Sequence, residues 1–285
     1  MTTLPGDLEI VDLRRGRGDP VLRSSDERLL LGFHRRVYKP AFPIVSEQES
    51  PNEWIPRIWD DPPESAWFEL YPLIAGRALD WPRRRRLYGA LFFEYYWRSS
   101  CALVTYLVVA PRMRRRGLAR FMLAEARTRL QALANARHGS DAALRAVFTE
   151  VNDPSKVRPE DDSIDPVQRM AAFERLGARI VDIPYVQPEL APGKGRAREL
   201  FLLVFPLPGL PDDRIATRTV GAFIDDFYRA NAVREPADDP DVRRMVEAMP
   251  GADVRLIRPS QHPDLAGLLS RTSAAGGLPI PRPAG

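Results

Sequence analysis

Hydrophobic residues along this chain follow two periods, and each period predicts a different kind of element. Alternating or continuous apolar runs predict strands at residues 8–13, 87–97, 101–109, 144–151, 179–183 and 199–205. Apolar residues that recur every three or four positions predict helices at residues 24–39, 118–133, 166–176, 217–231 and 242–249. The segment 40–80 is rich in proline and tryptophan and predicts only short helices.

The two apolar strands on either side of Arg98-Ser99-Ser100 predict an antiparallel hairpin. Side chains alternate along a strand, so Val104, Tyr106 and Val108 are expected on one face. A three-residue turn then sets Glu94 opposite Val104 and diagonal to Tyr106.

Some strands follow one another directly and others are joined through a helix, so the sheet is expected to be mixed. We therefore expect an α/β (α+β) fold with a mixed, mostly antiparallel central sheet flanked by helices, at residues 1–208. The pattern becomes helical after Pro206, which predicts a helical C-terminal extension at 209–260. The end of the chain is rich in Gly, Ala and Pro, and it predicts a disordered tail at 261–285.

The chain has 285 residues, of which 44% are hydrophobic, enough for one large domain with an extension. Cys101 is the single cysteine, so an intrachain disulfide or a cysteine metal site is excluded. The histidines have no ligand spacing, and we expect no metal. No apolar run reaches the ~20 residues that span a bilayer, and the N-terminus has no signal pattern. We expect a cytoplasmic protein with no membrane partner.

The net charge of +4 is carried almost entirely by arginine. This excess reflects either an arginine-rich residue usage or an anionic partner. A pI of 9.4 does not by itself point to nucleic acid, because acidic residues are interspersed throughout. The run Arg83–Arg86 also lacks aromatic interleaving, so a nucleic-acid partner is the weaker interpretation.

A basic glycine loop, Arg112 to Arg120, joins the apolar strand at 101–109 to the helix that begins at Leu118. The first turn of a helix leaves about four backbone N–H groups without partners, and the helix dipole adds positive charge there. Gly117 and the surrounding arginines therefore predict a site for a phosphate-bearing ligand. The spacing fits neither a Walker loop nor a dinucleotide GxGxxG motif.

The segment Leu107 to Ala119 resembles the signature loop of the GNAT superfamily of acetyl-CoA-dependent N-acetyltransferases. Arg114, Gly117 and Ala119 match its Arg/Gln-x-x-Gly-x-Gly/Ala pattern, which follows an apolar strand. The segment from Phe173 to Arg179 resembles a later helix of that family. The two matches and the order of strands cover roughly residues 87–205.

The resemblance implies a GNAT-like fold and acetyl-CoA, or another acyl-CoA, as co-substrate. It places the pyrophosphate on the backbone amides and arginines of the loop, and the pantetheine beside the preceding strand. The residues implied in donor binding are Leu107, Val108, Val109, Arg114, Arg115, Arg116, Gly117, Leu118 and Ala119. The N–H of Val108 is the candidate that polarises the thioester carbonyl.

The implied reaction is direct attack of an amine on the thioester in a ternary complex, which requires a base. Glu94 is the first candidate for the base, and Glu150 is the second. The tyrosine that the family often uses as a general acid falls at Phe173, which has no proton to give. Tyr106 and Tyr185 are the candidates to replace it.

We therefore expect an acyl-CoA-dependent N-acyltransferase whose acceptor is the amine of a small molecule. Two alternatives stay open. Phe173 favours a catalytically silent CoA-binding module with a regulatory or scaffold role, and the arginine runs are compatible with a nucleic-acid binder. The sequence leaves the oligomeric state open, and a homodimer is one option.

Overall fold

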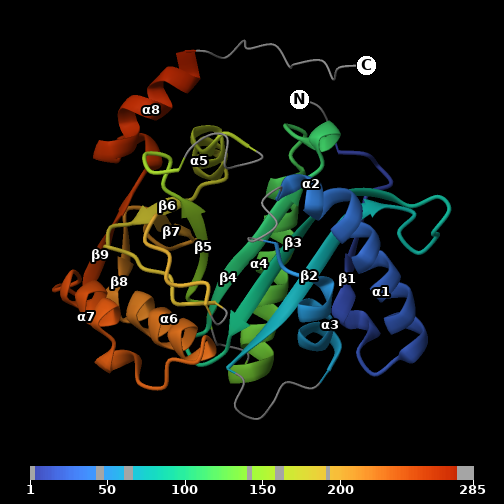
Figure 1. Cartoon of the computed structure of the whole chain (residues 1–285), viewed down its shortest axis with the longest axis horizontal. Coiled ribbons are helices and arrows are strands. Elements are labelled where there is room, and N and C mark those ends of the chain that lie inside the picture. Colours follow the sequence, from blue (N-terminus) through green and yellow to red (C-terminus); the bar gives the residue numbers. More distant parts are fainter. Residues whose placement is uncertain are drawn as a thin grey trace.

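The computed structural model describes residues 4–42, 48–60, 67–139, 143–157, 164–190 and 193–274. Within these residues a nine-stranded sheet runs through the molecule in the order β1-β2-β3-β4-β5-β7-β6-β9-β8 (Figure 1). The strands are β1 (Glu9–Asp12), β2 (Phe68–Arg77), β3 (Arg86–Tyr96), β4 (Cys101–Val109), β5 (Ala146–Asn152), β6 (Arg179–Val181), β7 (Leu200–Phe205), β8 (Arg214–Ala216) and β9 (Asp253–Ile257). Neighbouring strands are antiparallel except β4 and β5, which are parallel. The expected mixed, mostly antiparallel sheet flanked by helices is confirmed.

Helices cover both faces of this sheet (Figure 1). The α-helices are α1 (Pro20–Phe33), α2 (Lys39–Ala41), α3 (Pro51–Trp59), α4 (Leu118–His138), α5 (Pro166–Arg175), α6 (Thr217–Ala230), α7 (Pro240–Glu247) and α8 (Pro263–Ala274). A π-helical turn, His34–Tyr38, continues α1, and short 3₁₀ turns occur at Leu13–Gly16, Pro111–Met113, Pro236–Asp238 and Pro259–Gln261.

One face of the sheet packs against α4. Met122 and Leu130 of this helix lie in one apolar cluster with Leu91 and Phe93 of β3, which we call the α4 cluster. This helix is the longest in the described part of the chain, with 21 residues. Its apolar positions fall three or four residues apart, so one stripe faces the strands.

The opposite face of the sheet is covered in two halves. Over β2 and β3, Trp54 of α3 packs with Phe92, with the ring centroids 5.1 Å apart. Over β5 and β7, Phe223 of α6 stacks on Phe148 at 4.4 Å. Aromatic pairs of this kind add about 0.5–1.5 kcal/mol beyond the burial of their surface. The candidate catalytic residues Glu94 and Glu150 lie on this face, on β3 and β5.

The predicted register of the β3–β4 hairpin is wrong by one residue. Glu94 lies opposite Leu103, because Tyr96 pairs with Cys101 and the turn therefore has four residues, 97–100, and not three. A β-bulge between Phe92 and Phe93 then leaves Thr105 of β4 unpaired and restores the predicted register from Phe92 and Tyr106 onward. A bulge turns the following side chains to the other face. Val104 accordingly packs in the α4 cluster, whereas Tyr106 packs on the opposite face, so these two side chains do not share a face as predicted.

Two N-terminal elements also differ from the predictions. The first helix begins at Pro20 and not at Ser24, because Asp19 caps it by accepting hydrogen bonds from the amides of Val21 and Leu22. The strand β2 was not predicted, since it contains a proline. Pro72 is tolerated because it lies just beyond the last residue of β2 that pairs with β1.

The C-terminal part of the chain is more ordered and less helical than predicted. The extension at 209–260 contributes two strands, and β9 joins the central sheet beside β6. The predicted tail at 261–285 is wrong for its first part, because residues 263–274 form α8, and Leu265 and Leu269 are buried in the α4 cluster. Residues 275–285 lie outside the described residues.

Candidate functional site

The parallel strands β4 and β5 pair along only part of their length. Pairing runs from Cys101 with Ala146 to Val104 with Thr149, where the Thr149 hydroxyl donates to the Val104 carbonyl at 3.0 Å. The bulge follows immediately on β4. In Figure 1 the two strands diverge beyond this point. The last part of β4 therefore has no strand beside it on the β5 side within the described residues.

Backbone groups on this free edge of β4 alternate in direction. The amide of Ala110 donates to the carbonyl of Tyr88 at 2.8 Å, so alternate residues of β4, including Val108, face β3. The amides of Leu107 and Val109 face the other way, where the described residues include no strand to pair with them. The N–H of Val108 belongs to the β3–β4 ladder, so its predicted role in polarising a thioester carbonyl is wrong.

The basic loop lies between the end of β4 and the start of α4. Arg115 and Gly117 both have left-handed backbones, with φ values of 62° and 88°. Alternation of this kind turns successive N–H groups toward one side and makes an anion-binding concavity. No side chain caps the first turn of α4 at Gly117, so its amides keep their capacity to bind an anion.

The side chains of the loop divide into two groups. The arginines 114 to 116 are exposed, whereas Leu118 is buried and anchors the helix in the α4 cluster. Ala119 is partly buried. The Nε of Arg114 donates to the carbonyl of Val109 at 3.3 Å, which ties the loop to the free edge of β4.

Glu150 lies on β5, one residue past the point where β4 and β5 separate. The Tyr185 hydroxyl donates to its Oε1 at 2.6 Å, and Nε2 of Gln187 donates to its Oε2 at 2.8 Å. Burial is the largest cause that raises the pKa of Glu150 to about 7, against these two hydrogen bonds, which lower it. The negative charge of Glu94 raises it further. A carboxyl group of this kind exchanges protons near neutral pH.

Glu94 lies on β3, on the same face of the sheet, and is 6% exposed. Arg57 donates to its Oε1 and forms an ion pair with it, and the Tyr96 hydroxyl donates to its Oε2 at 2.5 Å. Burial, followed by the charge of Glu94, raises the pKa of Tyr96 well above its ordinary value. Glu94 thus has a cationic partner, whereas both partners of Glu150 are neutral donors, and this difference favours Glu150 over Glu94 as the base.

The two tyrosines proposed as acids lie in different surroundings. Tyr185 contacts Glu150 directly. Tyr106 belongs to the aromatic cluster under α3, where the Tyr38 hydroxyl donates to its hydroxyl at 3.4 Å and the Trp54 ring lies 5.8 Å away. Burial, and next the charge of Glu49, raise the pKa of Tyr106 well above 10. The structure thus brings Glu94, Glu150 and Tyr185 together and leaves Tyr106 in a packing role.

Three residues around these carboxylates were not singled out from the sequence: Arg57, Tyr96 and Gln187. Arg57 lies far from Glu94 in the sequence, and nothing local indicates the pair. Tyr185 and Gln187 are two apart in an extended segment, so their side chains share one side. Once Tyr185 is known to bind Glu150, this two-residue spacing indicates Gln187 as the second partner.

Other sequence features have structural explanations. Phe173 packs near Phe205, with the ring centroids 6.2 Å apart, and offers no polar atom. Asp153 accepts hydrogen bonds from the amide and hydroxyl of Ser155, which makes it a turn former. No cluster of potential metal ligands occurs in the described part of the chain. The described helices include none long and apolar enough to cross a membrane.

Comparisons with known proteins give matches only among solved structures. No protein-family profile matches the chain, and no curated protein does. A nourseothricin acetyltransferase matches with 16% identity and a TM-score of 0.32 over 49% of this chain and 66% of that chain, slightly under two thirds of its length.

Two further matches are longer. A protein from Desulfovibrio desulfuricans described as an acetyltransferase of the GNAT family has 14% identity and a TM-score of 0.40, covering 70% of this chain and 98% of that chain. The catalytic domain of a Tetrahymena histone acetyltransferase in complex with coenzyme A has 12% identity and a TM-score of 0.41, covering 73% and 99%. All three are described as acetyltransferases, the class of enzyme that the loop motif resembles. Likeness at this level concerns the arrangement of helices and strands and assigns no activity to this chain.

Proposed function

We propose that this protein is an acyl-CoA-dependent N-acyltransferase of the GNAT type, which transfers an acetyl or acyl group to an amine by direct attack. The observation that carries the proposal is the placement of Glu150. Its pKa of about 7 is that of a base at neutral pH, and it lies where β4 and β5 separate, beside the free edge of β4.

The donor is proposed to bind along the free edge of β4 and the first turn of α4. The amides of Leu107 and Val109 are unpaired by any described strand and suit the amide groups of a pantetheine arm. The uncapped first turn of α4, with Arg115 and Gly117 in left-handed conformations, suits a pyrophosphate. Arg114 and Arg116 add positive charge at the same end, since both side chains are exposed.

The chemistry proposed for the chain's own residues is as follows. Ionised Glu150 accepts the proton that the amine must lose as its nitrogen bonds to the thioester carbonyl carbon. The N–H of Leu107 or Val109 stabilises the negative charge that develops on the carbonyl oxygen, because a fixed donor needs no reorganisation during the reaction. A protonated amine first loses one proton to solvent. The proton that the neutral amine then gives to Glu150 passes to the thiolate as the carbon–sulfur bond breaks, so the proton count balances.

Tyr185 is proposed as a positioning residue for this base, because its hydroxyl already donates to Glu150. Glu94 is proposed to line the acceptor side of the site. Its carboxylate lies on the same face of the sheet, held by Arg57 and Tyr96, and its oxygens can accept hydrogen bonds from an amine beside the Arg57 ion pair. The acceptor class proposed is a small-molecule amine that approaches between the α3 and α6 halves of this face.

The experiment that tests the proposal measures CoA release from acetyl-CoA with a panel of amines, together with calorimetry of acetyl-CoA binding. Turnover that depends on an amine supports it. Absence of both turnover and CoA binding at millimolar ligand would exclude it.

A catalytically silent CoA-binding module is the second candidate, and Phe173 is the observation in its favour. Its ring packs against Phe205 at the position where the related enzymes often have a tyrosine acid. Binding of acetyl-CoA without turnover across the whole panel would favour this candidate over the first.

A further inference from the structure

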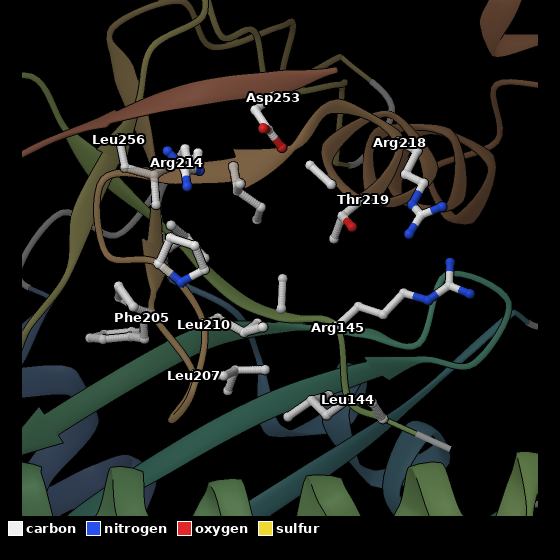
Figure 2. Close-up of a pocket in the computed structure, with 17 residues that line it drawn as sticks. Leu144, Arg145, Phe205, Leu207, Leu210, Arg214, Arg218, Thr219, Asp253 and Leu256 are labelled. Carbon is white, nitrogen blue, oxygen red and sulfur yellow. The ribbon is translucent and has the colours of Figure 1, made fainter. Parts of the chain in front are cut away.

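A pocket lies at the start of β5, the opposite end of this strand from Glu150. Figure 2 shows the side chains that line it. The pocket has a volume of about 460 Å³, within the range of small-molecule sites. β5 enters it at Ala146, four residues before Glu150, which corresponds to roughly 13 Å along a strand. The pocket is therefore separate from the proposed catalytic groups.

The pocket has an apolar wall and a cationic side. The wall consists of apolar side chains that come from the residues just before β5, the end of β7 and the loop after β7. Among them are Leu144, Phe205, Leu207 and Leu210. Arg145 and Arg218 come from different elements, and Figure 2 shows their guanidinium ends converging on one side of the pocket. Neither makes an ion pair with an acid among the described residues, in contrast to Arg196, which binds Asp239 and Asp241.

The first turn of α6 faces the same side. Ala216 provides no side-chain cap for this 14-residue helix, and Thr219 in its first turn lines the pocket with its hydroxyl. The amide of Thr217 already donates to the carbonyl of Ala252 at 2.8 Å, but no side chain caps the amides that follow. This helix start still favours an anion, and two converging guanidinium groups favour one more strongly. Asp253, the acid that lines this pocket, sits on β9 away from Arg145 in Figure 2, so it does not neutralise that pair.

We infer that this pocket binds an amphipathic organic anion. The anionic head lies between Arg145 and Arg218 at the start of α6, and the apolar body lies against Phe205, Leu207 and Leu210. Arginine recognises carboxylate and phosphate through paired N–H donors, so either head satisfies the chemistry. This inference rests on the pocket alone and does not depend on the proposed acyl transfer.

Calorimetry of the full chain with octanoate, octyl phosphate, octanol and octylamine tests the inference. The two anions are expected to bind, octanol to bind more weakly by about tenfold or more, and octylamine not to bind, because only a charged head forms the stronger, charge-assisted hydrogen bonds with arginine. Binding of only one of the anions identifies its head as carboxylate or phosphate. Failure of both anions at millimolar concentration, or equal binding of octanol, overturns the inference.

Variants separate the pocket from other sites. Arg145→Gln combined with Arg218→Gln is expected to weaken binding of the preferred anion by about tenfold or more, and both side chains are exposed, so the fold is retained. Arg83→Gln, an exposed arginine far from the pocket, is the matched control and leaves the affinity unchanged. Displacement of the anion by excess CoA, or equal affinity in the double variant and the control, would place the anion elsewhere.

Discussion

The Tyr185 hydroxyl donates a 2.6 Å hydrogen bond to Oε1 of Glu150, while Gln187 from the same extended segment holds the other oxygen. Both oxygens of a buried carboxyl are thus oriented by neutral donors. A neutral partner stabilises the ionised form less than an arginine does, so burial keeps the pKa of Glu150 high, at about 7. Glu94 differs from Glu150 in this respect, because one of its oxygens forms an ion pair with Arg57.

Glu150→Gln is expected to lower kcat/KM for an amine acceptor by about 10²–10⁴-fold, the range for loss of a general base. The affinity for acetyl-CoA is expected to stay unchanged, because the side chain lies beyond the proposed donor contacts. Steady-state kinetics and calorimetry measure the two effects. Glu199→Gln, at an exposed glutamate beside β7, is the control and should retain full activity. Equal activity of the two variants would remove Glu150 from the mechanism.

The same carboxyl group makes stability depend on pH. The pKa of Glu150 is about 7 in the folded protein and 4.5 as its ordinary value, so the folded state binds the proton more tightly. The resulting stabilisation is complete below about 4.5 and is lost as the pH rises to about 7. Urea unfolding across this window should show the wild-type free energy of unfolding falling relative to Glu150→Gln, by at most about 3 kcal/mol. Parallel curves for the two proteins would contradict the raised pKa.

Tyr185→Phe is expected to move the pH–rate profile in the alkaline direction. The hydrogen bond from Tyr185 lowers the pKa of Glu150, so its removal raises that pKa, and activity near neutral pH falls by about tenfold. Tyr228→Phe is the matched control, since its hydroxyl bonds to the Val186 carbonyl and not to Glu150. A midpoint that is the same in both variants would show that Tyr185 acts only in packing.

The fold was predictable where one local signal dominates. The apolar runs on either side of Arg98–Ser100 form the predicted hairpin, and Asp165 with Pro166 starts the predicted helix α5. The position of Glu94 was wrong by one residue because the apolar pattern does not show that the turn includes Trp97, and the bulge at Thr105 was not predictable because an unpaired residue leaves no mark in that pattern. The strand β2 was missed because Pro72 argues against a strand, although it lies where no β1 partner is needed.

The candidate site was only partly predictable. Glu94 and Glu150 follow from their positions on apolar strands, and the basic loop follows from Gly117. Their partners come from segments distant in the sequence, such as Tyr185, which is 35 residues from Glu150. The choice between the two carboxylates depends on these partners and on burial, neither of which a linear pattern contains.

Residues 263–274 are expected to contribute to stability. Leu265 is fully buried and Leu269 is 5% exposed in the same cluster as Met170 of α5. Leu265→Ala removes buried methyl groups and leaves a cavity, so it should reduce the free energy of unfolding by about 2–5 kcal/mol. Leu268→Ala, on the same helix but only partly buried, is the control and should cost less. Equal, small effects of both changes would show that α8 does not pack on the domain.

Gly117→Ala is expected to weaken acetyl-CoA binding by about tenfold, because the φ of 88° costs an alanine roughly 1–2 kcal/mol and the loop shifts to relieve it. A Cβ at this position meets no protein atom within 4 Å, so the effect comes from backbone conformation and not from a clash. Gly139→Ala is the matched control, since Gly139 follows the other end of α4 with a φ of 100°. Both variants should lower the melting temperature, and calorimetry should show weaker donor binding in Gly117→Ala alone. Weaker binding in both would mean that the donor responds to the stability of α4 and not to the geometry of its first turn.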